Sequence, residues 1–494
     1  MAGAPRAPAR LRAMSPASPS EQRDRAAELV ARLRAAWPRS LDAGGVDVGQ
    51  ALEQQLYFAL RDRPHRSGGP LRGIRRTLRG LAPLAAAGLA LRPRHEATGA
   101  GILVLIRQPV HARLLAPVRA AVRSRGGPEV AVARVGAAAS DDDLSGNGRR
   151  IDSFLGRRSI RDLLRNRVPA RALAGEWTPV TGDGELSRAL ASSATADLGR
   201  LRVGAVALRE ATRDTGAGVL VTYDEVGSWG RLVAAVAAAE RRRSVDLPHA
   251  EAVDEVAMRG MGFDRIAVFG EVSEQRVLSA GVAPERIVRI GSPVLDTLVA
   301  RATASHPAEP RRLVFASQYV AGVMTADVKR RTVEAAVLAA EAAAPCELVV
   351  VPHPVERDAI LEEVLSASAP AGVRVRRADR GTLHDALIGA WLLVTGSSQS
   401  VIEAAAAGIP SLTVNLTGGP DPVPYAAEGM ALGADSKDGA RAAVASLLDD
   451  PAWRAAVAGA RSSIERHVGP LDGRASERAA DLLVAEAAAS VAER

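Results

Sequence analysis

A turn rich in serine separates a buried strand from a helix near residue 397, and its residue types suit the binding of an anion. The apolar run 391–394 leads into Gly396, Ser397 and Ser398, after which apolar residues recur at helical spacing as far as Pro410. The first N–H groups of a helix have no backbone partner, and the helix dipole there favours negative charge. With the serine hydroxyls added, the sequence predicts a phosphate site; the alternative is a capped helix without a ligand.

A histidine follows a second apolar strand, in the stretch Val-Val-Val-Pro-His-Pro at 349–354. Pro354 and the proline before His353 restrict the backbone, so we expect the imidazole to have a fixed direction. Beside the serine turn, His353 can hydrogen-bond or charge-pair with a phosphate. Glu403, one turn into the following helix, can reach a ribose diol or cap that turn. Gln318, just after a further predicted strand, is assigned to the same site.

Candidates for proton transfer come from an earlier part of the chain. The predicted strand 244–247 runs into Pro248-His249, and the strand 218–222 runs into Asp224 and Glu225. A neutral imidazole or a carboxylate at a strand end can accept a proton from a hydroxyl group. We therefore predict His249 as the catalytic base, with Asp224 and Glu225 as alternatives. Helix capping is the competing role for Asp224.

Short apolar segments alternate with helical segments in two successive series, which predicts an α/β fold. The expected strands are 102–106, 129–135, 218–222, 244–247, 265–269 and 286–290, and then 313–316, 347–351, 373–376, 392–395 and 411–414. Apolar strands joined by helices form doubly wound parallel sheets. Two such sheets in tandem place a cleft at their carboxyl ends. Residues 196–213 are predicted to be a helix, 140–150 a polar loop, and 303–311 a linker.

Composition and missing motifs limit the function classes. The formal net charge is +8, and a single cysteine, Cys346, excludes an internal disulfide. No apolar run has the length of a membrane span, so we expect a cytoplasmic protein. The chain lacks a glycine-rich dinucleotide motif after its first strand, a P-loop, and a cysteine or histidine cluster for zinc. We expect no cofactor and no metal. The basic segment has almost no interleaved aromatics, which argues against nucleic acid.

The first 97 residues form a separate part in this interpretation. We expect a disordered beginning, then helices at 21–37 and 46–60, then a basic amphipathic segment at 71–91. A segment of this kind can lie on an anionic membrane surface, which would make the protein peripheral to the inner face of the membrane. An ordinary helix packed on its own domain is the alternative.

Four stretches resemble one group of GT-B nucleotide-dependent transferases, the CDP-glycerol glycerophosphotransferase, capsule-polysaccharide and polysialyltransferase-like group. They are 263–296, with Gly-x-Pro and then Asp; 349–356, with His-Pro; 392–410, with Ser-Ser and Glu-Ala-x-x-x-Gly-x-Pro; and 467–478, with Asp-Gly-x-Ala-Ser-x-Arg. The resemblance implies two Rossmann-like domains, an acceptor domain at 98–304 and a nucleotide-donor domain at 305–494 with closing helices.

The resemblance also implies roles for the candidate residues. His353, Ser397 and Ser398 would contact the phosphates of the nucleotide donor, and Glu403 its ribose. His249 matches the histidine of this group, although Ala250 follows it where the group usually has glycine.

The implied activity moves a sugar or polyol phosphate from a CDP-, CMP- or UDP-linked donor to a hydroxyl group. The acceptor would be a glycan or a lipid-linked molecule in the synthesis of cell-envelope or capsular polymers. UDP-N-acetylglucosamine 2-epimerases share the fold and the serine turn, so an epimerase is the alternative. A degenerate GT-B assembly factor at the membrane surface, without catalysis, is a further alternative.

Overall fold

The computed structural model covers most of the chain. It describes residues 19–36, 41–61, 101–135, 148–156, 170–224, 226–251, 254–304, 308–320, 324–353, 356–368, 370–379, 382–396, 398–421, 423–449 and 461–493. The basic segment 71–91 and three predicted site residues, Glu225, Pro354 and Ser397, lie outside the described residues.

The first sheet has seven parallel strands in the order β3-β2-β1-β4-β5-β6-β7. Its strands are β1 Ile102–Ile106, β2 Val130–Arg134, β3 Gly148–Arg150, β4 Val219–Thr222, β5 Arg243–Asp246, β6 Arg265–Val268 and β7 Ile287–Arg289. The strands β1 and β4 are buried at every position, because helices cover both faces of the sheet. The predicted α/β alternation is confirmed here.

Two predictions in this part of the chain need correction. The last three residues of the predicted loop 140–150 form β3, whose Gly148 pairs with Val132 of β2. An edge strand can form through backbone hydrogen bonds alone, so polar side chains do not exclude it. The helix predicted at 196–213 is longer in the structure. It is α7, which runs from Gly184 to Thr215 and is capped by Asp183.

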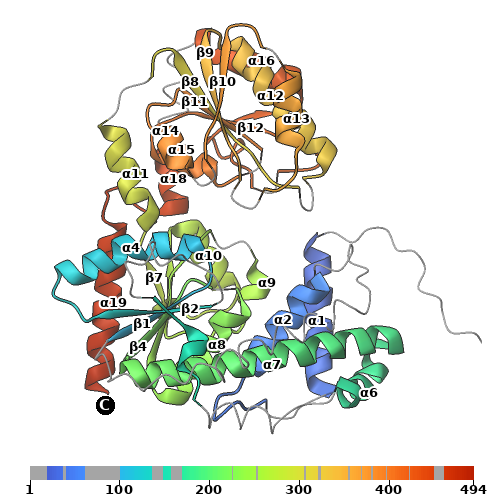
Figure 1. Cartoon of the computed structure of the whole chain (residues 1–494), viewed down its shortest axis with the longest axis vertical. Coiled ribbons are helices and arrows are strands. Elements are labelled where there is room, and N and C mark those ends of the chain that lie inside the picture. The colour runs from blue at the N-terminus through green and yellow to red at the C-terminus, as the bar shows by residue number, and fades with distance from the viewer. Residues whose placement is uncertain are drawn as a thin grey trace, which may run out of the picture.

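The second sheet has six parallel strands in the order β10-β9-β8-β11-β12-β13. Its strands are β8 Arg311–Ala316, β9 Cys346–Val351, β10 Val373–Arg377, β11 Leu392–Thr395, β12 Ser411–Val414 and β13 Leu432–Ala434. Its helices include α12 Ala326–Ala342, α13 Ile360–Ala367, α14 Leu383–Leu387, α15 Ser400–Ala406 and α16 Lys437–Asp449. We call the parts built on the two sheets the first and second unit; they lie one above the other in Figure 1.

The chain returns to the first unit at its end. The helix α18 (Arg461–Val468) lies between the units, and α19 (Ala475–Ala492) packs beside the first sheet, against α4 (Pro109–Ser124) (Figure 1). The carboxylate of Asp296, in α11 (Pro293–Thr303), accepts hydrogen bonds from the backbone N–H groups of Ala475 and Ser476 at 3.1 and 2.8 Å. The Gly-x-Pro…Asp and Asp-Gly-x-Ala-Ser stretches, far apart in sequence, are therefore joined by hydrogen bonds.

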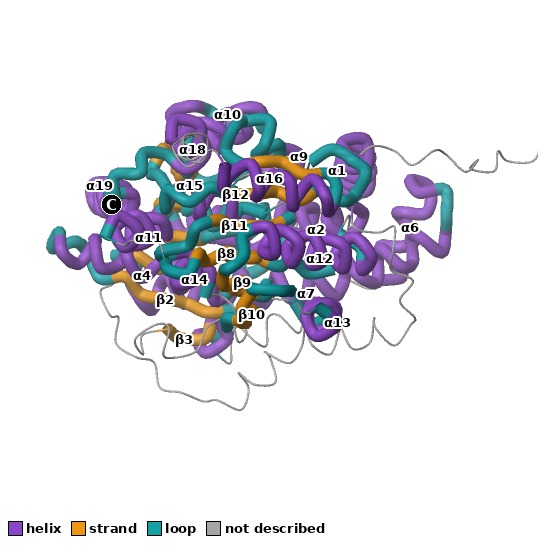
Figure 2. Tube along the Cα trace, turned by 90° about the horizontal axis from the view of Figure 1, so that it is seen from above, coloured by secondary structure: helices purple, strands orange, loops and turns teal. Residues whose placement is uncertain are grey.

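The two N-terminal helices belong to the core of the first unit. The predicted helices are confirmed as α1 (Pro19–Ala36) and α2 (Gly49–Arg61). Leu33 is fully buried, and Leu52 and Leu56 are nearly so, within the cluster that includes α7 and α8 (Ser228–Glu240). The indole N–H of Trp177, in α6 (Ala170–Thr181), donates to the Leu33 carbonyl at 3.0 Å. Seen from above, α6 and α19 mark opposite ends of the molecule (Figure 2). No described helix is both long and apolar enough to cross a membrane.

Candidate functional site

Three neighbouring strands of the second sheet end side by side. Ala316, the last residue of β8, pairs with Val351 at the end of β9 and with Thr395 at the end of β11. Parallel strands in this register bring the residues that follow them to one edge of the sheet. His353, Gln318 and Gly396 each follow their strand within two residues, so three predicted site residues share the carboxyl edge.

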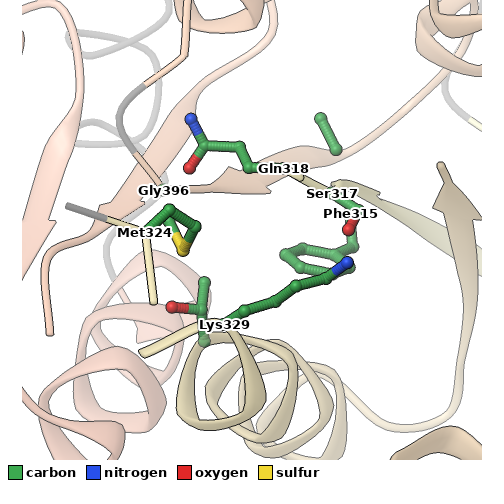
Figure 3. Close-up of a pocket in the computed structure, with 8 residues that line it drawn as sticks. Phe315, Ser317, Gln318, Met324, Lys329 and Gly396 are labelled. Carbon is green, nitrogen blue, oxygen red and sulfur yellow. The ribbon is translucent and has the colours of Figure 1, made fainter. Parts of the chain in front are cut away.

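A small cavity opens at this edge, between β8, β11 and α12 (Figure 3). Its lining residues include Gln318, Met324, Lys329 and Gly396. A Cβ atom on Gly396 would overlap the amide oxygen of Gln318 and lie 3.2 Å from the methyl carbon of Met324. A side chain at position 396 would therefore require Gln318 and Met324 to move.

A buried charge network, which the sequence analysis did not predict, supports the loop that holds His353. The ammonium of Lys329, which is 2% exposed, donates to carboxylate oxygens of Glu356 and Asp358, each at 2.6 Å. The second oxygen of Glu356 accepts from the backbone N–H of His353 at 2.9 Å. Ser317 donates to the first oxygen at 3.2 Å. Burying these charges is tolerable only because each is paired, and the pairing fixes the backbone at His353.

The His353 imidazole is half-buried and lies 4.7 Å, between ring centroids, from Tyr319. Burial lowers the pKa of His353; Glu356 opposes this shift and Lys329 adds to it. The ring is consequently neutral at neutral pH, with one nitrogen that donates and one that accepts. In this state His353 can donate a hydrogen bond to a phosphate oxygen without forming an ion pair.

Two further predicted residues of this edge have partners inside the protein. The Ser398 hydroxyl accepts from the backbone N–H of Ser400 at 3.2 Å, so it satisfies the first N–H group of α15 from the residue before the N-cap, Gln399. The Glu403 carboxylate lies 3.6 Å from the Nε2 atom of His384, with both side chains 27% exposed. Capping, weighed above as the alternative to ligand binding, therefore describes Ser398; Glu403 faces His384 rather than the turn.

Asp224, at the end of β4 in the first sheet, is held in place by neighbours. Its carboxylate accepts from the Arg107 guanidinium at 2.5 Å and from the backbone N–H of Gly230, in the first turn of α8, at 3.1 Å. The side chain caps that helix, which is the competing role considered for it, and it is 7% exposed.

His249 follows β5 and lies beside a second imidazole that sequence reasoning missed. The rings of His249 and His111 are 5.4 Å apart, and His111 lies 5.6 Å from the ring of Tyr223. His111 is 1% exposed, and its Nδ1 accepts from the backbone N–H of Arg107 at 3.4 Å. Burial, then the neighbouring His249 and Arg107, lowers the pKa of His111 to about 3. The available signal was a histidine in the first helical turn after the first buried strand.

Comparisons with known proteins agree on the architecture. Residues 265–484 match the sequence model of UDP-N-acetylglucosamine 2-epimerase, from β6 into α19. No curated protein sequence matches the chain. The structure of a putative UDP-N-acetylglucosamine 2-epimerase from Listeria monocytogenes aligns at 13% identity and a TM-score of 0.52, over 76% of this chain and 93% of that one. Another UDP-N-acetylglucosamine 2-epimerase structure aligns at 11% identity and 0.51, over 79% and 96%. The chain has the GT-B fold.

The wall teichoic acid polymerase TagF also aligns, at 10% identity and a TM-score of 0.46, over 86% of this chain and 100% of that one. The described residues contain no group of three or more histidine, cysteine or acidic side chains placed to hold a metal ion.

Three acidic side chains near the carboxyl edge of the first GT-B sheet are paired with an arginine, whereas Asp246, at the end of β5, accepts from the backbone N–H of Asp224 at 3.3 Å. Besides the Asp224–Arg107 pair, Asp254 lies 2.9 Å from Arg61 and Glu251 lies 3.4 Å from Arg276; these distances join guanidinium nitrogens to carboxylate oxygens. A carboxylate whose lone pairs are occupied by a guanidinium is a poor proton acceptor. His249 is therefore a better candidate for proton transfer than these three carboxylates.

Proposed function

We propose that this GT-B protein is an enzyme that moves a sugar or polyol phosphate from a nucleotide-activated donor to a hydroxyl group. The observation that carries the proposal is the division of side chains between the two sheets. His353, Gln318 and Gly396, which suit a phosphate, lie at the edge of the second sheet, and the His111 and His249 rings lie together at the edge of the first. This division matches the resemblance of four sequence stretches to the glycerophosphotransferase and capsule-polysaccharide group.

The second unit would hold the nucleotide donor in this proposal. His353 would donate a hydrogen bond to a phosphate oxygen, supported by the Lys329–Glu356 network that fixes its backbone. Gly396, Ser397 and Ser398 would offer backbone N–H groups to the same phosphates. Gln318 and Pro354 would border the phosphates, and Glu403 would bind the ribose diol. The chain would divide near residue 304, with the acceptor on the first unit.

His249 would act as the base in the first unit. An acceptor hydroxyl is a weak nucleophile at neutral pH and needs a group that takes its proton during transfer. An imidazole suits that role, since its unperturbed pKa lies close to neutrality. Asp224 is a weaker candidate because its Oδ2 atom already accepts from both Arg107 and the α8 backbone. Glu225 stays an alternative from the sequence.

Epimerisation of a sugar nucleotide is the second candidate, and the family-model match over residues 265–484 favours it. Inverting a carbon centre requires one group to remove a proton and another to return it on the opposite face. The arginine pairing of Asp224, Glu251 and Asp254 leaves few groups for such a pair. The transferase is therefore our first choice.

One experiment separates the candidates. The purified protein is incubated in D2O with UDP-N-acetylglucosamine, and with CDP-, CMP- and UDP-linked donors, each with and without a hydroxyl acceptor, and followed by NMR. A transferase releases nucleotide only when acceptor is present and leaves the sugar carbons undeuterated. A 2-epimerase incorporates deuterium at C2 of UDP-N-acetylglucosamine without acceptor. Absence of nucleotide binding by calorimetry would favour the non-catalytic assembly factor.

The basic segment 71–91 would place the enzyme on an anionic membrane surface. Removing the whole N-terminus cannot test this, because α1 and α2 complete the core of the first unit. Replacing Arg72, Arg75, Arg76 and Arg79 by glutamine is the better test. Sedimentation with anionic vesicles should fall, and the loss should be largest at low salt. Unchanged sedimentation would remove the membrane proposal.

A further inference from the structure

A buried histidine of α18 joins the two units through carboxylates. The Nδ1 atom of His467 lies 2.8 Å from the Oε1 atom of Glu251, and its Nε2 atom lies 2.7 Å from the Oε2 atom of Glu428. Glu251 belongs to the first unit, two residues after His249. Glu428 belongs to the second unit, between β12 and β13. The His467 side chain is 2% exposed. We call these three side chains the His467 bridge.

The His467 imidazole carries a charge in this arrangement. Both ring nitrogens face carboxylate oxygens, and each such bond needs a proton on the nitrogen. Burial opposes this charge, but hydrogen bonds and attraction from Glu251 and then Glu428 outweigh it and raise the pKa of His467. Arg276, on α10 (Glu271–Ser279), lies 3.4 Å from Glu251, so its charge and that of the imidazolium offset the two carboxylates of Glu251 and Glu428. If His467 lost one of these protons, the bare ring nitrogen and the carboxylate oxygen opposite it would both be acceptors, and their hydrogen bond would be lost.

The backbone on either side of His467 is fixed to the first unit. A Cβ atom on Gly270 would lie 2.5 Å from the carbonyl oxygen of Arg466 and 2.8 Å from that of His467. Gly469 has a φ of +75°, and a Cβ atom there would lie 2.6 Å from the Phe269 carbonyl oxygen. Only glycine permits this approach. Glu428, whose side chain is 37% exposed, is thus the part of the bridge that belongs to the other unit.

The bridge also borders the proposed nucleotide-donor edge. The ring of Tyr425 lies 6.5 Å from that of His467. Burial, then the charge of Glu251 and, further down, those of Glu428 and Glu403, raises the pKa of Tyr425, with Arg276 opposing. Glu403 of α15 is therefore close enough to act electrostatically on this group. The bridge therefore lies within electrostatic range of the helix that follows the serine turn.

The geometry points to His467 as a positioning residue that holds the His249 loop relative to the nucleotide-donor unit. The inference rests on the proposed transferase and adds a requirement to it: His249 acts as a base when neutral, while His467 acts only as an imidazolium. The rate should therefore rise with pH as His249 loses its proton and fall again at higher pH as His467 loses its own. The groups that face His467 are Glu251, Arg276, Tyr425 and Glu428.

Three variants test the inference. His467→Gln should lower kcat about tenfold, keep the nucleotide Kd within about twofold, and remove the alkaline fall of the pH profile. Glu428→Gln should move that fall to lower pH, because one of the two carboxylates that raise the His467 pKa is gone. Glu271→Gln is the matched control: Glu271 pairs with the adjacent Arg466 at 3.6 Å without touching His467, and its profile should match the parent.

Imidazole NMR gives a readout that needs no turnover. At pH 7 both His467 nitrogens should carry protons in the parent, and His467→Gln should shift the His249 ring signals. If His467→Gln does not fold, the exposed Glu428→Gln variant decides alone through the same signals. Unmoved His249 signals in Glu428→Gln, or a neutral His467 at pH 7 in the parent, would overturn the inference. If the parent binds no nucleotide but the variants shift the His249 signals as predicted, the proposed function would be wrong and the His467 bridge would still be supported.

Discussion

The carboxyl edges of the two sheets hold their histidines in different ways. At the first edge, His111 and His249 face each other, and the acids Asp224, Glu251 and Asp254 are occupied by arginines. At the second edge, the acid Glu356 binds the backbone of His353 and leaves its ring to other contacts. In the proposed function, His249 would accept a proton at the first edge and His353 would donate a hydrogen bond at the second. We therefore expect mutations at the first edge to lower turnover and mutations at the second edge to weaken nucleotide binding.

The largest effect is expected at the first edge. His249→Ala should lower turnover about 100-fold or more and leave nucleotide affinity near that of the parent, because a base acts on the acceptor hydroxyl and not on the donor. Steady-state kinetics and calorimetry on the same protein measure both quantities. Retained turnover here, with loss in Asp224→Asn, would transfer the base to the carboxylate. Full turnover in both variants would argue against base-assisted transfer.

The opposite pattern is expected at the second edge. His353→Ala should weaken nucleotide binding by about 1.5–3 kcal/mol, or about 10- to 100-fold in Kd, because a hydrogen bond to a charged phosphate is lost. Parent-like affinity in His353→Ala would place the phosphates elsewhere and remove the distinction between the edges.

The sequence located the edges but not the contacts across them. Alternation of buried strands and helices determines where parallel strands end, so Asp224, His249, Gln318 and His353 could be placed at carboxyl edges. The His467–Glu251 contact joins residues 216 positions apart and depends on how α18 docks on the first unit. No local pattern encodes that docking.

Local sequence also gave no sign of the Lys329 network or of β3. The sequence around Lys329 has the pattern of an ordinary amphipathic helix, in which a lysine is expected at the surface. Its burial depends on the positions of Glu356 and Asp358. The strand β3 forms because β2 presents a free edge, and its own residues are polar.

A pH effect on stability is expected from the buried histidine of the first edge. The pKa of His111 in the folded chain is about 3, whereas an unfolded histidine has a pKa of about 6.5. Below pH 6.5 the unfolded state therefore binds a proton that the folded state does not. The free energy of unfolding should fall by about 1.4 kcal/mol for each unit of pH until the folded pKa is reached. Above pH 6.5 His111 should contribute no pH dependence.

His111→Gln removes this titration. Denaturant unfolding between pH 6.5 and 4 should show a shallower decline for the variant than for the parent, so that the difference between them grows as the pH falls. The His384→Gln variant, at a histidine that is 27% exposed, should keep the slope of the parent. Equal slopes in parent and His111→Gln would mean that His111 is protonated in the folded protein, and the contrast with the carboxylate-bound His467 would disappear.

The smallest effect is expected at the serine turn, and it sharpens the assignment of the second edge. The Ser398 hydroxyl already accepts the Ser400 backbone N–H, so only its own proton is left to bind a phosphate oxygen. Ser398→Ala should weaken nucleotide binding about two- to fivefold, or about 0.5–1 kcal/mol, because the backbone N–H groups of the turn would still bind the phosphates. Loss of the cap should also lower stability by about 1 kcal/mol, and Ser398→Asp should restore the cap while repelling the phosphates. Calorimetry and thermal unfolding of both variants separate the two roles. A Ser398→Asp variant that binds nucleotide as tightly as the parent would mean that the turn serves only to cap α15.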